Sequence, residues 1–129
     1  MEIRKRILIA EDVDYQRRAV RAILEPEGFE VVGEASDGRE AVRLFETLRP
    51  DMVLLDLVMP GMCGLSALRE IRRRCGNTPI VVCSGVGQER LAAEAVVSGA
   101  NDFVVKPFHP FRLLATLWRN QPKKLEKLL

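Results

Sequence analysis

Short apolar runs alternate with helical patterns along the whole of this 129-residue chain. Each run is followed by a stretch in which apolar residues recur three or four positions apart, such as Leu91, Ala95 and Val96 after the fourth run. Strands that alternate with helices predict a parallel sheet with helices on both faces. The expected strands are residues 7–10, 30–33, 52–55, 80–83 and 102–105.

The polarity of the runs predicts where each strand lies in the sheet. The first, third and fourth are continuously apolar, as strands buried on both faces must be, whereas the second and fifth carry polar residues typical of edges. The flanking residues mark the helices. Expected starts are Asp14, Asp37 with Glu40 as a capping box, and Pro110, and expected stops are Gly28, Gly76 and Gly99.

Strand–helix units fill the chain to about residue 120, which predicts one domain over 1–120. Residues 121–129 are expected to be a short C-terminal tail or the start of a linker. The net charge of +2 is too small to attract nucleic acid by itself, so the basic clusters at 4–6, 72–74 and 123–124 are interpreted as solvated helix faces and ends.

The apolar runs are too short to cross a bilayer, and the N-terminus has no secretory signal pattern. Cys63, Cys75 and Cys83 are an odd number without metal-ligand spacing, so neither a disulfide framework nor a zinc site is predicted. We therefore expect a soluble, cytoplasmic protein without membrane insertion.

Polar residues follow four of the five expected strands. Glu11 and Asp12 follow the first, Asp56 the third, Ser84 the fourth and Lys106 the fifth. Ligands of open parallel sheets bind at the carboxyl ends of the strands, so these side chains are expected to converge. Glu11, Asp12 or Ser84 taken singly is also a plausible helix cap.

Clustered carboxylates repel one another and favour a cation, and hard oxygen ligands favour Mg²⁺ or Mn²⁺. Lys106 then supplies a positive charge directed at an anion. The loops contain neither a P-loop nor a dinucleotide-binding motif. His109 has no nucleophile near it in the sequence and is interpreted as a surface or capping residue.

Three segments carry a family resemblance: 56–64, with its Met-Pro and following Gly, 83–88, and 99–108. Over almost its whole length the chain resembles the receiver domain of two-component response regulators, most nearly the single-domain chemotaxis regulators of the CheY type. The resemblance implies an α/β, flavodoxin-like (βα)5 doubly wound parallel sheet with strand order 2-1-3-4-5.

The resemblance also implies a phosphorylation site. Asp56 is expected to accept a phosphoryl group from a sensor histidine kinase or a small donor. Asp12, Asp56 and the backbone carbonyl of Val58 are expected to bind Mg²⁺ directly, and Glu11 through water. The chain would then be a signalling switch and not an enzyme, apart from its own phosphorylation and dephosphorylation.

Phosphoryl binding and switching are expected of Ser84, Lys106 and Phe103. Lys106 pairs with the phosphoryl oxygens, Ser84 moves towards them, and Phe103 turns inward. The Lys106–Pro107 peptide bond is expected to be cis. The surface of the fourth helix, fifth strand and fifth helix is expected to bind a downstream protein.

The sequence departs from common members of this family at several positions. Glu11 stands where Asp is commoner, and Leu57 where chemotaxis regulators often have Trp. Val58 and Val86 occupy positions that tune dephosphorylation, which predicts slow hydrolysis. Plain packing under a loop is the alternative interpretation of this pair.

Two alternatives concern the function as a whole: an N-terminal receiver fragment of a larger regulator with a DNA-binding or enzymatic output, and a Mg²⁺-dependent phosphohydrolase with an aspartyl nucleophile. The oligomeric state is expected to be a monomer or a phosphorylation-promoted homodimer. Candidate dimer contacts are Leu91, Ala95 and Trp118, although core packing would explain the same residues.

Overall fold

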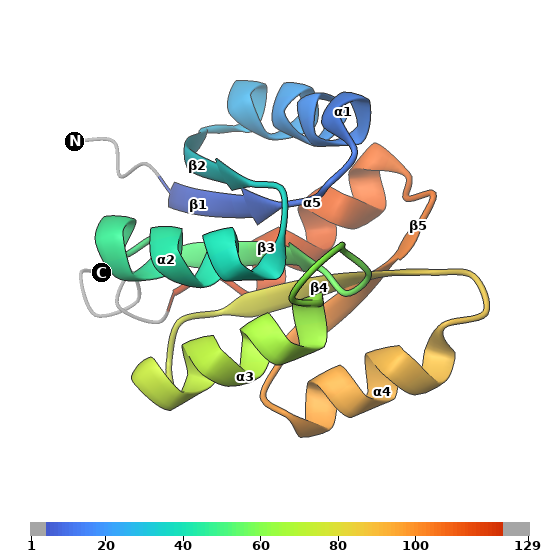
Figure 1. Ribbon diagram of the computed structural model, residues 1–129. Helices are drawn as coiled ribbons and strands as arrows, with labels where there is room; N and C mark the ends of the chain where they lie inside the picture. The colour runs from blue at the N-terminus through green and yellow to red at the C-terminus, as the bar shows by residue number, and fades with distance from the viewer. Residues whose placement is uncertain (1–4, 123–129) are drawn as a thin grey trace.

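The strands form one parallel sheet in the order β2-β1-β3-β4-β5 in the computed structural model, which describes residues 5–122 (Figure 1). This confirms the flavodoxin-like fold and the expected strand order. The strands are β1 (Lys5–Ala10), β2 (Phe29–Ala35), β3 (Met52–Asp56), β4 (Ile80–Gly85) and β5 (Asp102–Lys106). The helices are α1 (Asp14–Leu24), α2 (Gly38–Leu48), α3 (Gly64–Arg74), α4 (Glu89–Val97) and α5 (Pro110–Arg119), with a 3₁₀ turn η1 (Glu25–Glu27) after α1.

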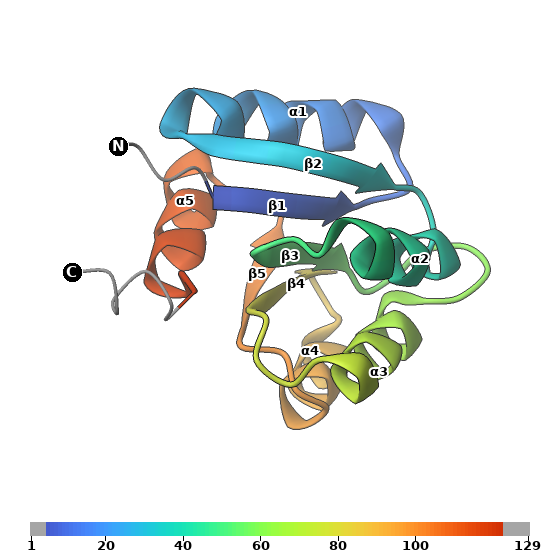
Figure 2. The ribbon, with the colours of Figure 1, turned by 90° about the vertical axis from the view of Figure 1, so that its left-hand side faces the viewer.

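Helices cover both faces of the sheet, with α1 and α5 on one side and α2, α3 and α4 on the other (Figure 2). Alternate residues of β1 point to opposite faces. Ile7 and Ile9 pack with Leu24 and Leu113 in one core cluster, whereas Leu8 packs with residues of α2 and α3 in the other. Each buried side chain of this size contributes about 1.5–3 kcal/mol, which explains why residues 7–10, 52–55 and 80–83 of the central strands are apolar.

The two edge strands are β2 and β5, as their polar residues predicted. On β5, however, the exposed positions include apolar side chains. Phe103 is 44% exposed and Val105 is 43% exposed. The β5 edge therefore presents an apolar surface to solvent.

Two of the predicted helix starts hold. Asp37 is the N-cap of α2, where its Oδ1 accepts a hydrogen bond from the Glu40 amide at 2.8 Å. The Glu40 carboxylate accepts a hydrogen bond from the Ser36 amide, not from the amide of the cap residue Asp37. His109 caps α5 by accepting from the Phe111 amide at 3.1 Å, with Pro110 at the first helical position. The interpretation of His109 as a capping residue is confirmed.

The predicted cap at Asp14 is wrong. Val13 is the N-cap of α1 and makes no side-chain capping bond, and Asp14 is the first helical residue. The Glu11 carboxylate accepts from the amide of this cap residue at 3.2 Å. The Asp14 carboxylate accepts from Arg17 Nη2 at 2.7 Å, one turn on, and does not cap a helix amide.

The predicted stop at Gly28 holds after η1, where its φ of 89° is a left-handed value that Gly adopts without strain. Gly99 also has a positive φ and lies just after α4, but Gly76 does not and merely follows the Cys75 cap.

The apolar face expected for the fourth helix is partly wrong. Ala92 and Ala95 are buried in α4, whereas Val96 is 45% exposed. Val96 lies on the next ridge of the helix, which turns away from the core towards β5. Ala95 is fully buried in the core, so it cannot be a dimer contact. Leu91 packs against the same core, and Trp118 on α5 is 38% exposed.

Helix α5 ends at Arg119, and the described chain ends at residue 122. Most of the predicted tail over 121–129 therefore lies outside the described residues. Between residues 5 and 122 no helix is long and apolar enough to span a membrane. Cys63, Cys75 and Cys83 are free thiols.

Candidate functional site

An acidic cluster lies at the carboxyl edge of the sheet, where β1 and β3 end. Glu11 and Asp12 follow β1, and Asp56 is the last residue of β3. One carboxylate oxygen from each lies within 4.8 Å of the other two. The strand-end pattern predicted this convergence, and the structure brings the three residues together.

Lys106 joins the cluster from the end of β5. Its Nζ donates to Glu11 Oε1 at 2.6 Å, to Asp56 Oδ2 at 2.6 Å and to Gln16 Oε1 at 3.3 Å. Burial lowers the pKa of Lys106, but hydrogen bonds to Asp56 and Glu11 outweigh burial and raise that pKa above its ordinary value of 10.5. Lys106 is therefore a fixed cation between two buried carboxylates.

The cluster keeps a net negative charge, because three carboxylates surround one ammonium. Glu11 and Asp56 are buried, and Asp12 is half-buried. These are hard oxygen donors without a thiolate or imidazole among them, a set that suits Mg²⁺ or Mn²⁺ and not Zn²⁺. The geometry and the charge fit a divalent cation.

Asp56 is held at both carboxylate oxygens. Oδ1 accepts from the Val58 amide at 3.1 Å, and Oδ2 accepts from Lys106. Both contacts orient the side chain towards the edge of the sheet. Leu57, the residue between Asp56 and Val58, is fully buried. Its side chain anchors the chain where β3 ends.

The loop after β3 returns to Asp56 at Gly64, the first residue of α3. A Cβ on Gly64 would lie 2.0 Å from the Asp56 carbonyl oxygen, and the Gly64 amide donates to the Leu57 carbonyl at 3.1 Å. Only Gly permits this backbone approach. Gly64 thus sets the path of the loop that carries Val58.

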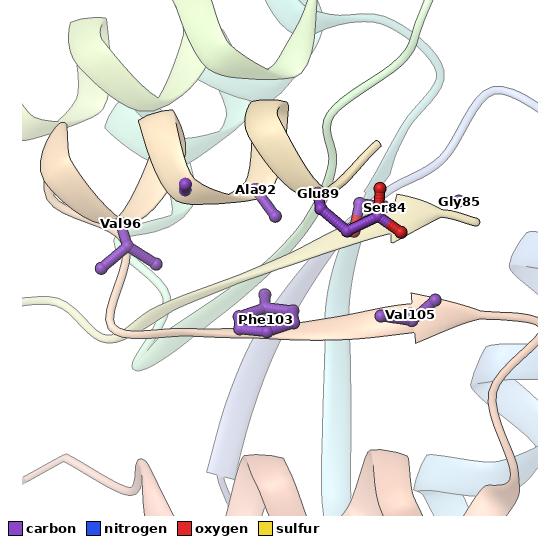
Figure 3. Close-up of a pocket in the computed structure, with 8 residues that line it drawn as sticks. Ser84, Gly85, Glu89, Ala92, Val96, Phe103 and Val105 are labelled. Carbon is purple, nitrogen blue, oxygen red and sulfur yellow. The ribbon is translucent and has the colours of Figure 1, made fainter. Parts of the chain in front are cut away.

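Ser84 is buried near the end of β4, and it lines a cavity of about 170 Å³ between α4 and β5 (Figure 3). Figure 3 shows Phe103 and Val105 of β5 facing Ala92 and Val96 of α4 across this cavity. The cavity lies between Ser84 and the exposed β5 edge.

The Lys106–Pro107 peptide bond is cis.

Val58 and Val86 are 50% and 80% exposed, in the loops after β3 and β4. Both valines border the carboxyl edge of the sheet. Val86 is therefore mostly open to solvent, whereas Val58 is half-covered by its surroundings.

Two residues of α1 belong to this region and were not predicted from the sequence. The Gln16 side chain contacts Lys106, and the Arg17 guanidinium donates to the Glu11 carbonyl at 2.7 Å. Their spacing, about one helical turn after Asp12, is the signal that could have indicated them. Polar residues at such positions usually face solvent, so that signal is weak.

A family model, the response regulator receiver domain, matches residues 7–117. Chemotaxis protein CheY of Thermotoga maritima is 44% identical over 113 residues, which cover 88% of this chain and 94% of that protein. Chemotaxis protein CheY of Bacillus subtilis is 41% identical over 112 residues, covering 87% and 93%.

Solved structures agree with these matches. The CheX–CheY–BeF₃–Mg²⁺ complex from Borrelia burgdorferi contains a chain that is 31% identical and superposes with a TM-score of 0.82, over 86% of this chain and 84% of that one. The fold, the acidic cluster and the sequence similarity therefore all indicate the same family. The chain belongs to the response regulator receiver domain family, and it is a CheY-like signalling domain of two-component systems, not an enzyme.

Proposed function

We propose that Asp56 accepts a phosphoryl group from the phosphohistidine of a sensor histidine kinase, or from a small donor such as acetyl phosphate. An Asp56 oxygen forms a bond to phosphorus as the bond from phosphorus to the donor breaks, and the donor leaves with the electron pair. The supporting observation is the orientation of the buried Asp56 carboxylate, which is held by the Val58 amide and Lys106.

The acidic residues would hold Mg²⁺, with Mn²⁺ as a substitute. Asp12, Asp56 and the Val58 backbone carbonyl would bind it directly, and Glu11 through water. The cation, when bound, screens the charges of the carboxylate and the incoming phosphoryl oxygens. The relative from Borrelia burgdorferi was solved with both Mg²⁺ and the beryllofluoride group.

Lys106 would move its ammonium from Asp56 Oδ2 to the phosphoryl oxygens. The move needs little displacement, because the phosphoryl group is attached to the carboxylate that Lys106 already contacts. Ser84 would follow by donating its hydroxyl. The phosphoryl group then adds hydrogen bonds that exist only in the active packing, which shifts the population towards it.

The cavity between α4 and β5 gives this shift a path to the surface. Phe103 would turn from its half-exposed position into the cavity beside Ser84. The face formed by α4, β5 and α5 would change shape as a result. Its exposed apolar side chains fit a downstream protein partner. They include Val96, Phe103, Val105, Phe111 and Trp118.

The valines beside the site would set the lifetime of the phosphorylated form. Val58 and Val86 offer no polar group that could orient a water molecule towards the acyl phosphate, so hydrolysis should be slow. We place the protein in the cytoplasm, in a chemotaxis-type pathway, as a monomer or a phosphorylation-promoted dimer. Nucleic acid is not a direct partner in this proposal.

Of the two alternative functions, the Mg²⁺-dependent phosphohydrolase is rejected, because the chain belongs to a family of signalling domains. A receiver that belongs to a larger regulator would work by the same phosphorylation chemistry, so the test below applies to both forms.

Intact-mass spectrometry after incubation with acetyl phosphate and Mg²⁺ tests the proposal. We expect a gain of one phosphoryl group in the wild type, and none in Asp56→Asn or after chelation of the metal. Absence of an adduct, together with no binding of beryllofluoride, would refute phosphorylation of this domain.

A further inference from the structure

We infer that Arg17 is a positioning residue for the metal site, because its guanidinium fixes the peptide that joins Glu11 to Asp12 without touching either carboxylate. The inference rests on the proposed cation site at these residues. The side chain of Arg17 lies on α1 and is only 16% exposed, so its contacts are sheltered from solvent.

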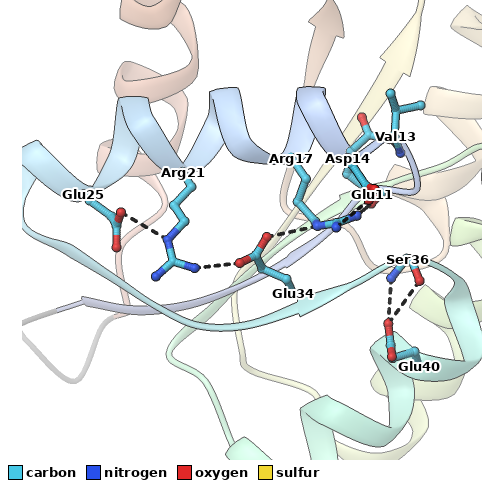
Figure 4. A network of polar contacts seen from close by, with 9 residues as sticks. All are labelled: Glu11, Val13, Asp14, Arg17, Arg21, Glu25, Glu34, Ser36 and Glu40. Atoms are coloured by element: carbon cyan, nitrogen blue, oxygen red, sulfur yellow. Dashed lines mark hydrogen bonds and ion pairs between the residues drawn. The ribbon is translucent and has the colours of Figure 1, made fainter.

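The Arg17 guanidinium bridges three parts of the chain (Figure 4). Its Nη1 donates to the Glu11 carbonyl at 2.7 Å, its Nε to Glu34 Oε1 on β2 at 3.0 Å, and its Nη2 to Asp14 Oδ1 at 2.7 Å. A guanidinium has five N–H donors in a rigid fork, so it can make these contacts at once.

The far end of this bridge is also fixed. Glu34 receives a second hydrogen bond from Arg21 Nη1 at 2.6 Å, and Arg21 is itself paired with Glu25 at 3.1 Å. Figure 4 shows this row of alternating charges running between α1 and β2 up to the Glu11 loop. Arg17 is therefore held in place by the body of the fold.

The Glu11 peptide needs such a partner because the sheet ends there. The Glu11 amide still donates to the Ala35 carbonyl at 2.9 Å, but Ala35 is the last residue of β2. The Glu11 residue is buried, and an unpaired carbonyl at a buried residue costs free energy. Arg17 supplies the missing donor.

That carbonyl belongs to the planar peptide between Glu11 and Asp12, so holding its oxygen fixes the plane. The plane sets the directions in which the two side chains leave the backbone. Mutation of a residue that orients a metal ligand typically weakens metal binding by about 10–100-fold. Arg17 should act on the metal site in this way.

Charge and position make opposite predictions for the loss of Arg17. Removal of a positive charge near three carboxylates should strengthen cation binding by Coulomb attraction alone. Removal of the hydrogen-bond donor to the Glu11 carbonyl should weaken cation binding. The direction of the change therefore separates the two effects.

The experiment is a calorimetric titration of Mg²⁺ into the full chain, with circular dichroism to verify folding. We expect Arg17→Gln to bind Mg²⁺ about tenfold or more weakly than the wild type. Arg18→Gln is the matched control, because Arg18 is the exposed neighbour on the same helix and carries the same charge. Its affinity should stay within about twofold of the wild type, since exposed charges are largely screened.

Arg17→Lys provides a second variant that keeps the charge, in case Arg17→Gln does not fold. Lysine cannot hold Glu34 and the Glu11 carbonyl in the same fork, so Mg²⁺ binding should still weaken several-fold. Unchanged or tighter binding in a folded Arg17 variant would overturn the inference. Failure of the wild type itself to bind Mg²⁺ would instead refute the proposed cation site.

Discussion

The Lys106 ammonium lies 2.6 Å from Oδ2 of Asp56, the residue at which we place phosphoryl chemistry. The same ammonium lies 2.6 Å from Glu11 Oε1. One ammonium therefore pairs with two buried carboxylates in the unphosphorylated domain, and we assign the same ammonium to the phosphoryl oxygens after transfer. In this proposal, stability and signalling depend on the same side chain.

Loss of Lys106 should destabilise the domain when Mg²⁺ is absent. Lys106→Met leaves Glu11 and Asp56 buried without their partner, which we expect to cost about 3 kcal/mol near neutral pH. Denaturant unfolding with and without Mg²⁺ measures this cost, and Mg²⁺ should restore part of it. Equal stability of the variant and the wild type without Mg²⁺ would contradict the assigned role.

The pH dependence of stability follows from the raised pKa of Lys106. Hydrogen bonds to Asp56 and Glu11 outweigh the opposing effect of burial, so the folded protein holds this proton more tightly than the unfolded chain does. The contribution is fully present below the ordinary pKa of 10.5 and is lost as the pH rises through the higher folded value.

Unfolding free energies at pH values above about 10 should therefore fall more steeply in the wild type than in Lys106→Met. The variant serves as the control for the other groups that titrate in this range. Parallel curves for the two proteins would show that Lys106 gains no proton affinity on folding.

Removal of one carboxylate from the acidic cluster should separate stability from metal binding. Asp12→Asn relieves repulsion, so the metal-free protein should be at least as stable as the wild type. Mg²⁺ at 100 times its dissociation constant should stabilise the wild type by about 2.7 kcal/mol and the variant far less. Thermal melts measure both, and Glu30→Gln, at an exposed site on β2, should behave like the wild type.

Gly64 should tolerate no side chain. Gly64→Ala places a Cβ 2.0 Å from the Asp56 carbonyl oxygen, which we expect to cost at least about 2 kcal/mol and to displace the loop that orients Asp56. Gly76→Ala is the matched control, since a Cβ there meets no atom within 4 Å. Urea unfolding of both variants is the measurement, and similar midpoints would contradict the close approach.

Polar groups in place of the two exposed valines should shorten the life of the phosphorylated form. The double variant Val58→Asn, Val86→Glu should hydrolyse its phosphoryl group about tenfold faster or more, because its side chains can orient water. Folding stability should change by less than about 0.5 kcal/mol, since both sites are exposed. Val97→Asn, at a 90% exposed site on α4, should leave the hydrolysis rate unchanged.

The sequence predicts the fold well because strands buried on both faces of the sheet appear in the sequence as continuous apolar runs. Residues 80–83 of β4 are all apolar because helices cover both sides of this strand, whereas an edge strand such as β2 carries polar residues. The acidic cluster was predictable for a related reason: parallel strands bring their carboxyl ends to one edge. Residues far apart in the sequence, such as Glu11 and Lys106, meet there.

The contacts that the sequence did not predict depend on side-chain reach. Asp14 has the chemistry of a helix cap, but it is the first helical residue and its carboxylate pairs with Arg17. Arg17 could equally have faced solvent, and only the position of Glu34 on β2 shows that it does not. Val96 satisfies the helical period, yet it lines the cavity between α4 and β5 and is 45% exposed.

The most direct test of the central claim is to identify the residue that carries the phosphoryl group. Borohydride reduces an acyl phosphate to an alcohol and so converts a phosphorylated aspartate into homoserine, which peptide mass spectrometry can locate. After treatment with acetyl phosphate and Mg²⁺, we predict homoserine at position 56 and at no other acidic residue. Reduction at Asp12 or Glu11, or at no residue in a protein that has gained the mass of a phosphoryl group, would contradict the assignment of Asp56.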